Sequence, residues 1–184
     1  HFVKYDKGGQ HMDEAIERIK KEVHSKLNFE RYNSTVVREY TNCYSHALGS
    51  QYIGVEDDTY RIGAISGKKD KDERFISVEE LKELFFADLS TLELGVSEIL
   101  FADKESFLKN IEGMDLSDNQ HIVVLFAIIY SNNQISDFHF IRYDRSVGWT
   151  DKRYDHYPSF LENIHISWPT GWEKKVVGAY IITR

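Results

Sequence analysis

The sequence predicts an α+β fold in which helices come first and an antiparallel sheet follows. Apolar residues recur at helical spacing in the first half of the chain, whereas the part after residue 121 alternates or runs apolar between turn residues. The chain has 184 residues, of which 41% are hydrophobic, and this is enough to bury one core. We therefore expect N-terminal helices packed on one side of a C-terminal antiparallel sheet.

Two helices are predicted before residue 52. Residues 13–27 carry apolar side chains every three to four positions with charged residues between them, which is typical of an amphipathic helix. A shorter helix should begin at Cys43, after a polar and β-prone run. It should end soon after Gln51, because Gly49 weakens it.

Two more helices are predicted in the middle of the chain. Ser77 and Glu80 have the spacing of a capping box, which favours a helix from that point, and a second helix is expected near residues 104–111. The preceding segment 54–73 is rich in glycine and charge. It should form an exposed loop, which could cover a substrate at a neighbouring active site.

The strands follow in a meander. Residues 122–130 are continuously apolar, as expected for a central strand buried on both faces, and residues 137–144 alternate. A turn at 145–148 leads into a returning strand at 149–154, and residues 176–183 form the last strand.

The charge of the chain and the length of its apolar runs argue against two classes of partner. The formal net charge is −7 and the basic residues are scattered, so no positive stripe is available to bind nucleic acid. The apolar run 121–130 is too short for a membrane helix, which needs about 18 residues. We expect a peptide or protein substrate as the partner, and neither nucleic acid nor membrane.

The lone cysteine and the N-terminus indicate where the protein works. One cysteine excludes an internal disulfide and fits a reducing compartment. Residues 1–11 contain no secretory signal, and the junction with Met12 resembles a cloning scar, so we expect 12–184 to be the native single domain. The expected location is the cytoplasm, or a site reached through a specialised secretion system without a classical signal peptide.

Cys43 is the candidate nucleophile and His139 the candidate acid and base. The cysteine opens a predicted helix, whose dipole favours the reactive thiolate. The histidine lies in a later alternating strand, from which it can take and return a proton. Either residue alone is also typical of an inert core. Together and in this order they indicate a cysteine-nucleophile hydrolase, which requires no cofactor.

A third residue should orient the imidazole through its other nitrogen. With a four-residue turn at 145–148, Asp151 lies opposite Arg142 and forms a cross-strand ion pair. A register shifted by one residue instead places Asp151 and Asp155 on the face of His139. Both registers are open at this point, so Asp151 is the candidate and Asp155 its alternative.

The oxyanion of the reaction needs hydrogen-bond donors. The backbone N–H of Cys43 is the expected donor, because it lies at a helix start. The Asn42 side chain is a candidate second donor, although an asparagine in this position also serves as a helix N-cap.

Three motifs resemble those of bacterial papain-like Cys/His hydrolases, namely Asn42-Cys43-Tyr44-x-x-Ala47-Leu48-Gly49, Asp137-x-His139-Phe140-x-Arg142-x-Asp144 and Gly148-Trp149-Thr150-x-Lys152. That superfamily includes proteases, peptidoglycan amidases, deamidases and secreted effectors. The resemblance implies a papain-like catalytic domain over 12–184, whose cysteine helix packs on the sheet. It also implies that Cys43 is the nucleophile, His139 the acid and base and Asp151 the orienting residue, and that a peptide or amide bond is cleaved.

Two other functions remain open. Cys43, His46, Asp137 and His139 could form a zinc site, since the first two are spaced for one helix face and the last two for one strand face. Alternatively, the cysteine is inert and the protein is a binding domain, with an aromatic C-terminal region that contains Trp168, Trp172 and Tyr180. Within the enzyme class, deamidase and transglutaminase chemistry uses the same pair of residues.

Overall fold

The computed structural model confirms the predicted α+β class, with a few helices and one six-stranded antiparallel sheet. It describes residues 7–54, 59–69, 74–75, 77–130, 134–153, 155–161 and 172–184. Trp168 and much of the charged run near residue 70 lie outside these ranges. Within them, no helix has the length and apolar character that crossing a membrane requires.

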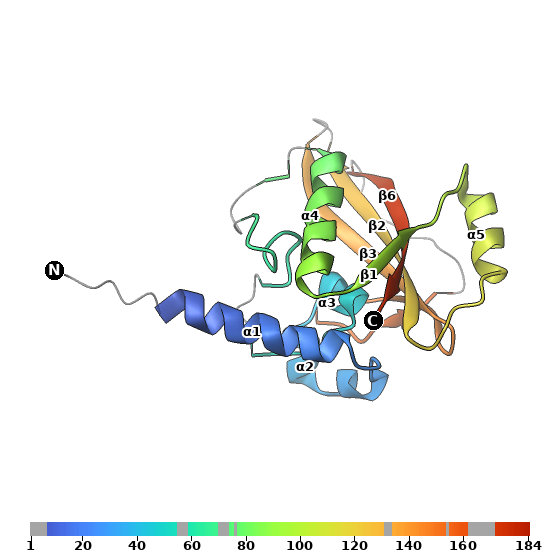
Figure 1. Ribbon diagram of the computed structural model, residues 1–184. Coiled ribbons are helices and arrows are strands. Elements are labelled where there is room, and N and C mark those ends of the chain that lie inside the picture. The colour runs from blue at the N-terminus through green and yellow to red at the C-terminus, as the bar shows by residue number, and fades with distance from the viewer. Residues whose placement is uncertain are drawn as a thin grey trace.

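Five α-helices and one 3₁₀-helix are described (Figure 1). Four of them begin after a residue whose side chain caps the helix. The helix predicted at 13–27 is displaced toward the N-terminus, and the short helices at 29–39 were not predicted. The helices predicted from Ser77 and near 104–111 are both present. The bounds are α1 (Lys7–Val23), η1 (Phe29–Asn33), α2 (Thr35–Glu39), α3 (Cys43–Leu48), α4 (Val78–Thr91) and α5 (Lys104–Glu112).

The strands pair antiparallel in the order β1-β6-β2-β3-β4-β5. As the continuous apolar run predicts, β2 is buried on both faces and lies between β6 and β3. The short edge strands β1 and β5 were not predicted. The bounds are β1 (Gly95–Glu98), β2 (Gln120–Tyr130), β3 (Ile135–Asp144), β4 (Gly148–Asp151), β5 (Ser159–Phe160) and β6 (Trp172–Thr183).

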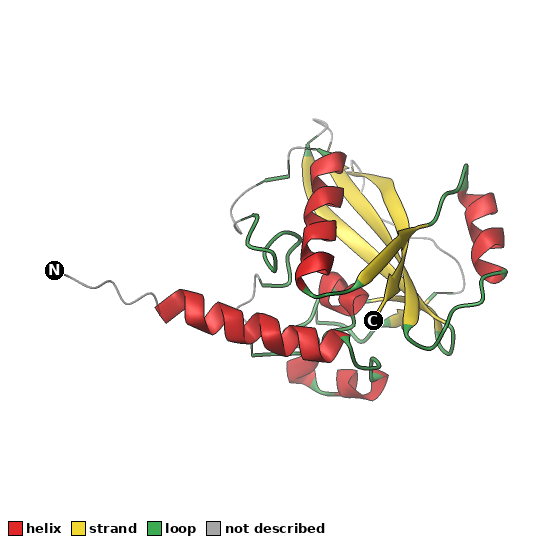
Figure 2. Ribbon diagram, in the orientation of Figure 1, coloured by secondary structure: helices red, strands yellow, loops and turns green. Residues whose placement is uncertain are grey.

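The expectation that helices cover one side of the sheet is wrong, because each face has its own hydrophobic core. Figure 2 shows helices on either side of the strands. Side chains of α1, α3 and α4 pack on the face that carries Val123, Leu125 and Phe140. Phe107 of α5 joins the core on the other face, where alternate β2 residues such as Val124 lie. The sheet is thus buried on both sides.

Helix α3 is fixed to β3 by stacking and by a buried arginine. The ring of Tyr44 stacks on Phe140 with 5.3 Å between centroids. Arg142 is 1% exposed and donates from Nη1 to the carbonyl oxygen of His46 at 3.0 Å, near the C-terminus of α3. Gly49 ends the helix with a φ of 87°, and a Cβ there would lie 3.0 Å from the same guanidinium nitrogen. The cysteine helix therefore has a defined position on the strand that carries His139.

Candidate active site

Cys43 is the first residue of α3, and its helix begins with a complete capping box. The Asn42 Oδ1 accepts hydrogen bonds from the backbone N–H groups of Tyr44 (2.9 Å) and Ser45 (3.0 Å), and Ser45 Oγ accepts from Asn42 N–H (2.9 Å). The N–H of Cys43 is not among the groups that donate a hydrogen bond to the Asn42 side chain. The cysteine is a partly exposed residue at a helix start.

His139 lies between Cys43 and Asp151. Its Nε2 is 2.6 Å from Asp151 Oδ1, and Cys43 lies close enough for its side chain to act on the ring and raise its pKa. Since the carboxylate engages Nε2, the nitrogen available to the thiol is Nδ1. The side chains of His139 and Asp151 are 6% and 2% exposed, so solvent competes little with the bond between them. The geometry is that of a nucleophile, a base and an orienting carboxylate.

The surroundings of His139 favour its protonated form. Burial alone would lower the pKa of the imidazole. The charge on Cys43 and the hydrogen bonds from Asp151 and Cys43 outweigh this effect and raise the pKa to about 9. In Asp151 the hydrogen bond and the charge of His139 overcome burial and lower the pKa of the carboxyl. Both directions describe a protonated imidazole paired with the Asp151 carboxylate.

The hairpin register selects Asp151. The loop between β3 and β4 is 145–147, so Ile141 pairs with Asp151 and Arg142 with Thr150. This is the second of the two registers that the sequence left open, and it places Asp151 on the face of His139. The cross-strand ion pair between Asp151 and Arg142 is not formed, because Arg142 Nε binds Asp144 Oδ2 at 2.7 Å.

The structure does not bring Asp155 to the imidazole. The carboxylate is exposed, with a side-chain exposure of 69%, and its ion-pair contact is to His156 at 3.9 Å. The Asn42 side chain is the N-cap, and its Nδ2 donates to the carbonyl oxygen of Tyr60 at 2.8 Å. The geometry of Asn42 thus favours the capping role over an oxyanion role.

Two neighbours of Asp151 add to the site and were not assigned a role from the sequence. Arg153 Nε donates to Asp151 Oδ2 at 2.8 Å, so both carboxylate oxygens are held. Lys152 is fully buried and points to the other face, where Nζ donates to Thr41 O at 3.0 Å and Arg38 O at 3.2 Å. Burial lowers the pKa of Lys152 to about 8, and the charge on Cys43 acts in the opposite direction. Alternation continued from β4 into the next two residues could have indicated that Lys152 and Arg153 face opposite sides once the register was known.

The four residues of the alternative zinc site do not form a cluster. Within the described part of the chain, no three His, Cys, Asp or Glu side chains are grouped to hold a metal ion. Both ring nitrogens of His46 are engaged inside the protein, Nδ1 with Tyr32 Oη at 2.9 Å and Nε2 with Thr150 Oγ1 at 2.8 Å. Burial, with the charge of Arg142, lowers the pKa of His46 to about 3. His46 is a neutral core residue that ties α3 to β4.

Comparisons with family models, with curated proteins and with solved structures find no match to this chain. The functional argument therefore depends on the geometry of the site.

Proposed function

We propose that the protein is a cysteine-nucleophile hydrolase that cleaves a peptide or amide bond. The observation that carries the proposal is that the His139 ring hydrogen-bonds the Asp151 carboxylate and lies where the Cys43 side chain acts on it. A cysteine at a helix start, with a histidine and a carboxylate on two adjacent strands, is the arrangement that papain-like hydrolases use. The α+β architecture, in which the cysteine helix packs on the histidine strand, supports a papain-like domain.

The geometry supports a two-step reaction. The Cys43 thiolate attacks the carbonyl carbon while His139 holds the proton, and the backbone N–H of Cys43 stabilises the oxyanion. His139 gives its proton to the leaving amine as the C–N bond breaks, which leaves a thioester on Cys43. The neutral imidazole then takes a proton from water, the hydroxyl attacks the thioester, and the acid product and the thiol are released. Asp151 keeps the ring oriented and stabilises the imidazolium.

The test is the reactivity of the thiol and the fate of a peptide-based electrophile. We expect iodoacetamide to alkylate Cys43 rapidly at neutral pH, and members of a peptide electrophile library to form a Cys43 adduct detectable by mass spectrometry. The substitution His139→Ala should slow both reactions by about 10²-fold, the low end of the range for a positioned base. The control is His156→Ala, since this imidazole is 74% exposed and its ion-pair contact is with the exposed Asp155.

A thiol that reacts slowly and equally in the wild type and in His139→Ala would contradict the proposal. The cysteine would then be an inert part of the core, and the binding-domain alternative would apply.

A further inference from the structure

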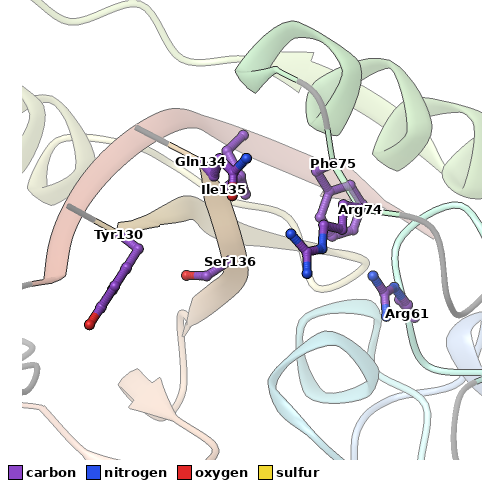
Figure 3. A pocket seen from close by; sticks show the side chains of 7 residues that line it. All are labelled: Arg61, Arg74, Phe75, Tyr130, Gln134, Ile135 and Ser136. Carbon is purple, nitrogen blue, oxygen red and sulfur yellow. The ribbon is translucent and has the colours of Figure 1, made fainter. Parts of the chain in front are cut away.

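A cavity of about 350 Å³ opens beside the start of β3. One of its walls is formed by the loop residues Arg61, Arg74 and Phe75, and the other by Tyr130 at the end of β2 and Ser136 in β3 (Figure 3). The segment that follows Arg61 is held in place by a buried carboxylate, because Asp88 accepts hydrogen bonds from the backbone N–H groups of Gly63 and Ser66 at 2.7 Å each. The Arg61 side of the cavity is therefore anchored to α4.

The charged side chains among the described residues that line the cavity are two arginines. Figure 3 shows the guanidinium groups of Arg61 and Arg74 on the same wall. The Arg61 guanidinium lies over the ring of Phe75 at 5.2 Å, which orients it. Lys69 also lies over this ring, but its ammonium pairs with Glu80 at 2.7 Å. Arginine pairs are suited to carboxylates because the guanidinium presents a planar fork of donors.

The cavity is next to the candidate active site. Ser136 precedes His139 by three positions on β3, which is about 10 Å along a strand. On the opposite wall, the residue before Arg61 is Tyr60, whose carbonyl oxygen holds the Asn42 cap of the cysteine helix at 2.8 Å. Asp137 follows Ser136 on β3, and the charges of both His139 and Arg61 act on its carboxyl and oppose the rise in pKa that burial causes.

We propose that this cavity binds a carboxylate of the peptide substrate, one to three residues from the bond that is cleaved. The inference rests on the proposed hydrolase function and gives it a substrate class. The carboxylate belongs either to an acidic side chain or to the free C-terminus of the peptide, since both present the same two oxygens to Arg61 and Arg74.

Binding to a protein that cannot react provides the test. The variant Cys43→Ala is titrated with three peptides and followed by calorimetry: acetyl-Ala-Glu-Ala-Ala-amide, acetyl-Ala-Gln-Ala-Ala-amide, and acetyl-Ala-Gln-Ala-Ala with a free carboxyl end. We expect the first or the third peptide to bind about tenfold or more tightly than the neutral second peptide, because one charge-assisted hydrogen bond supplies that difference. Which of the two binds tightly identifies the source of the carboxylate.

Two charge-removing variants locate the effect. In the Cys43→Ala background, Arg74→Gln and Arg61→Gln should each remove most of the preference for the carboxylate. Arg74 is exposed, so its replacement leaves the core intact. Arg18→Gln on α1 is the matched control, since it removes the same charge from another exposed arginine.

Equal binding of the three peptides, no binding at millimolar concentration, or a preference that persists in both arginine variants would overturn the inference. Failure of the hydrolase proposal is seen separately, as a wild-type Cys43 that iodoacetamide alkylates no faster than a free thiol.

Discussion

Replacing Asp151 by asparagine should lower the pKa of His139 by about one unit. The carboxylate lies 2.6 Å from Nε2 and both groups are buried, so the bond is charge-assisted and little screened. Such a bond is worth about 1.5–3 kcal/mol, whereas the neutral bond that an asparagine can form is worth about 0.5–1.5 kcal/mol. The difference is about 1–2 kcal/mol, and one pKa unit corresponds to about 1.36 kcal/mol. The pKa should therefore fall from about 9 to roughly 8.

The assay is a titration of the histidine ring signals by NMR, which requires no substrate. The His139 signal is assigned by its loss in His139→Ala. The matched control is Asp155→Asn, since this carboxylate lies only a few residues further along the chain but is 69% exposed and does not reach the imidazole. An unchanged His139 titration in Asp151→Asn, or an equal decrease in Asp155→Asn, would refute the assignment of Asp151 as the orienting residue.

Three further results are expected. Replacing Lys152 by methionine should slow alkylation of Cys43 at neutral pH, because a buried positive charge near the thiolate is lost. The same change should lower the free energy of unfolding by about 1–3 kcal/mol, because two buried carbonyls lose their donor. Alkylation kinetics measure the first effect and urea titration measures the second. Peptide hydrolysis should decline above about pH 9 as the His139 imidazolium loses its proton, while alkylation of Cys43, which needs only the thiolate, should not. The free energy of unfolding should fall as the pH drops from 6.5 toward 3, by up to about 1.4 kcal/mol per pH unit from His46. The reason is that the unfolded chain binds a proton at His46 that the folded protein does not. Urea titration against pH measures this slope, and His46→Gln should reduce it.

Each of these expectations can fail independently. If Cys43 is alkylated at the wild-type rate in Lys152→Met, the charge of Lys152 does not influence the reactivity of the thiol. Parallel loss of hydrolysis and alkylation at high pH would indicate unfolding in place of a titrating imidazole. An acid slope that His46→Gln leaves unchanged would assign the proton uptake to other groups, of which the buried His121 is the first candidate because burial also lowers its pKa.

The placement of Cys43 and His139 could be predicted from the sequence because it depends on short-range patterns. Asn42 has the residue type of an N-cap, and the cap fixes the helix start at the next residue. The alternation of 137–144 and the apolar run of 122–130 similarly determine two neighbouring central strands. The roles of these residues remain predictions until the reactivity of the thiol is measured.

The residue that orients His139 could not be chosen from the sequence, because the segment 145–148 is compatible with a turn of either three or four residues. Gly148 adopts a φ of 88° as the first residue of β4, so the loop is 145–147 and the register is fixed. The side of the sheet that α5 covers was equally inaccessible, because it depends on packing between segments far apart in the chain. The cavity near Arg61 has the same origin, since its walls come from the loop before α4 and from the β2–β3 end.

The register of one hairpin separates structural from candidate catalytic roles along β4 and the residues that follow it. Thr150 and Lys152 face α3, where they bind His46 and the carbonyl oxygens before the cysteine helix. Asp151 and Arg153 alternate with them, and Asp151 reaches the ring of His139. Because β4 leaves β3 at Ile141, no described strand pairs with the outer edge of β3 at His139, so the ring can meet both the carboxylate and the thiol. A slip of one residue would exchange the two sets and place Thr150 and Lys152 beside the imidazole, where neither supplies a carboxylate.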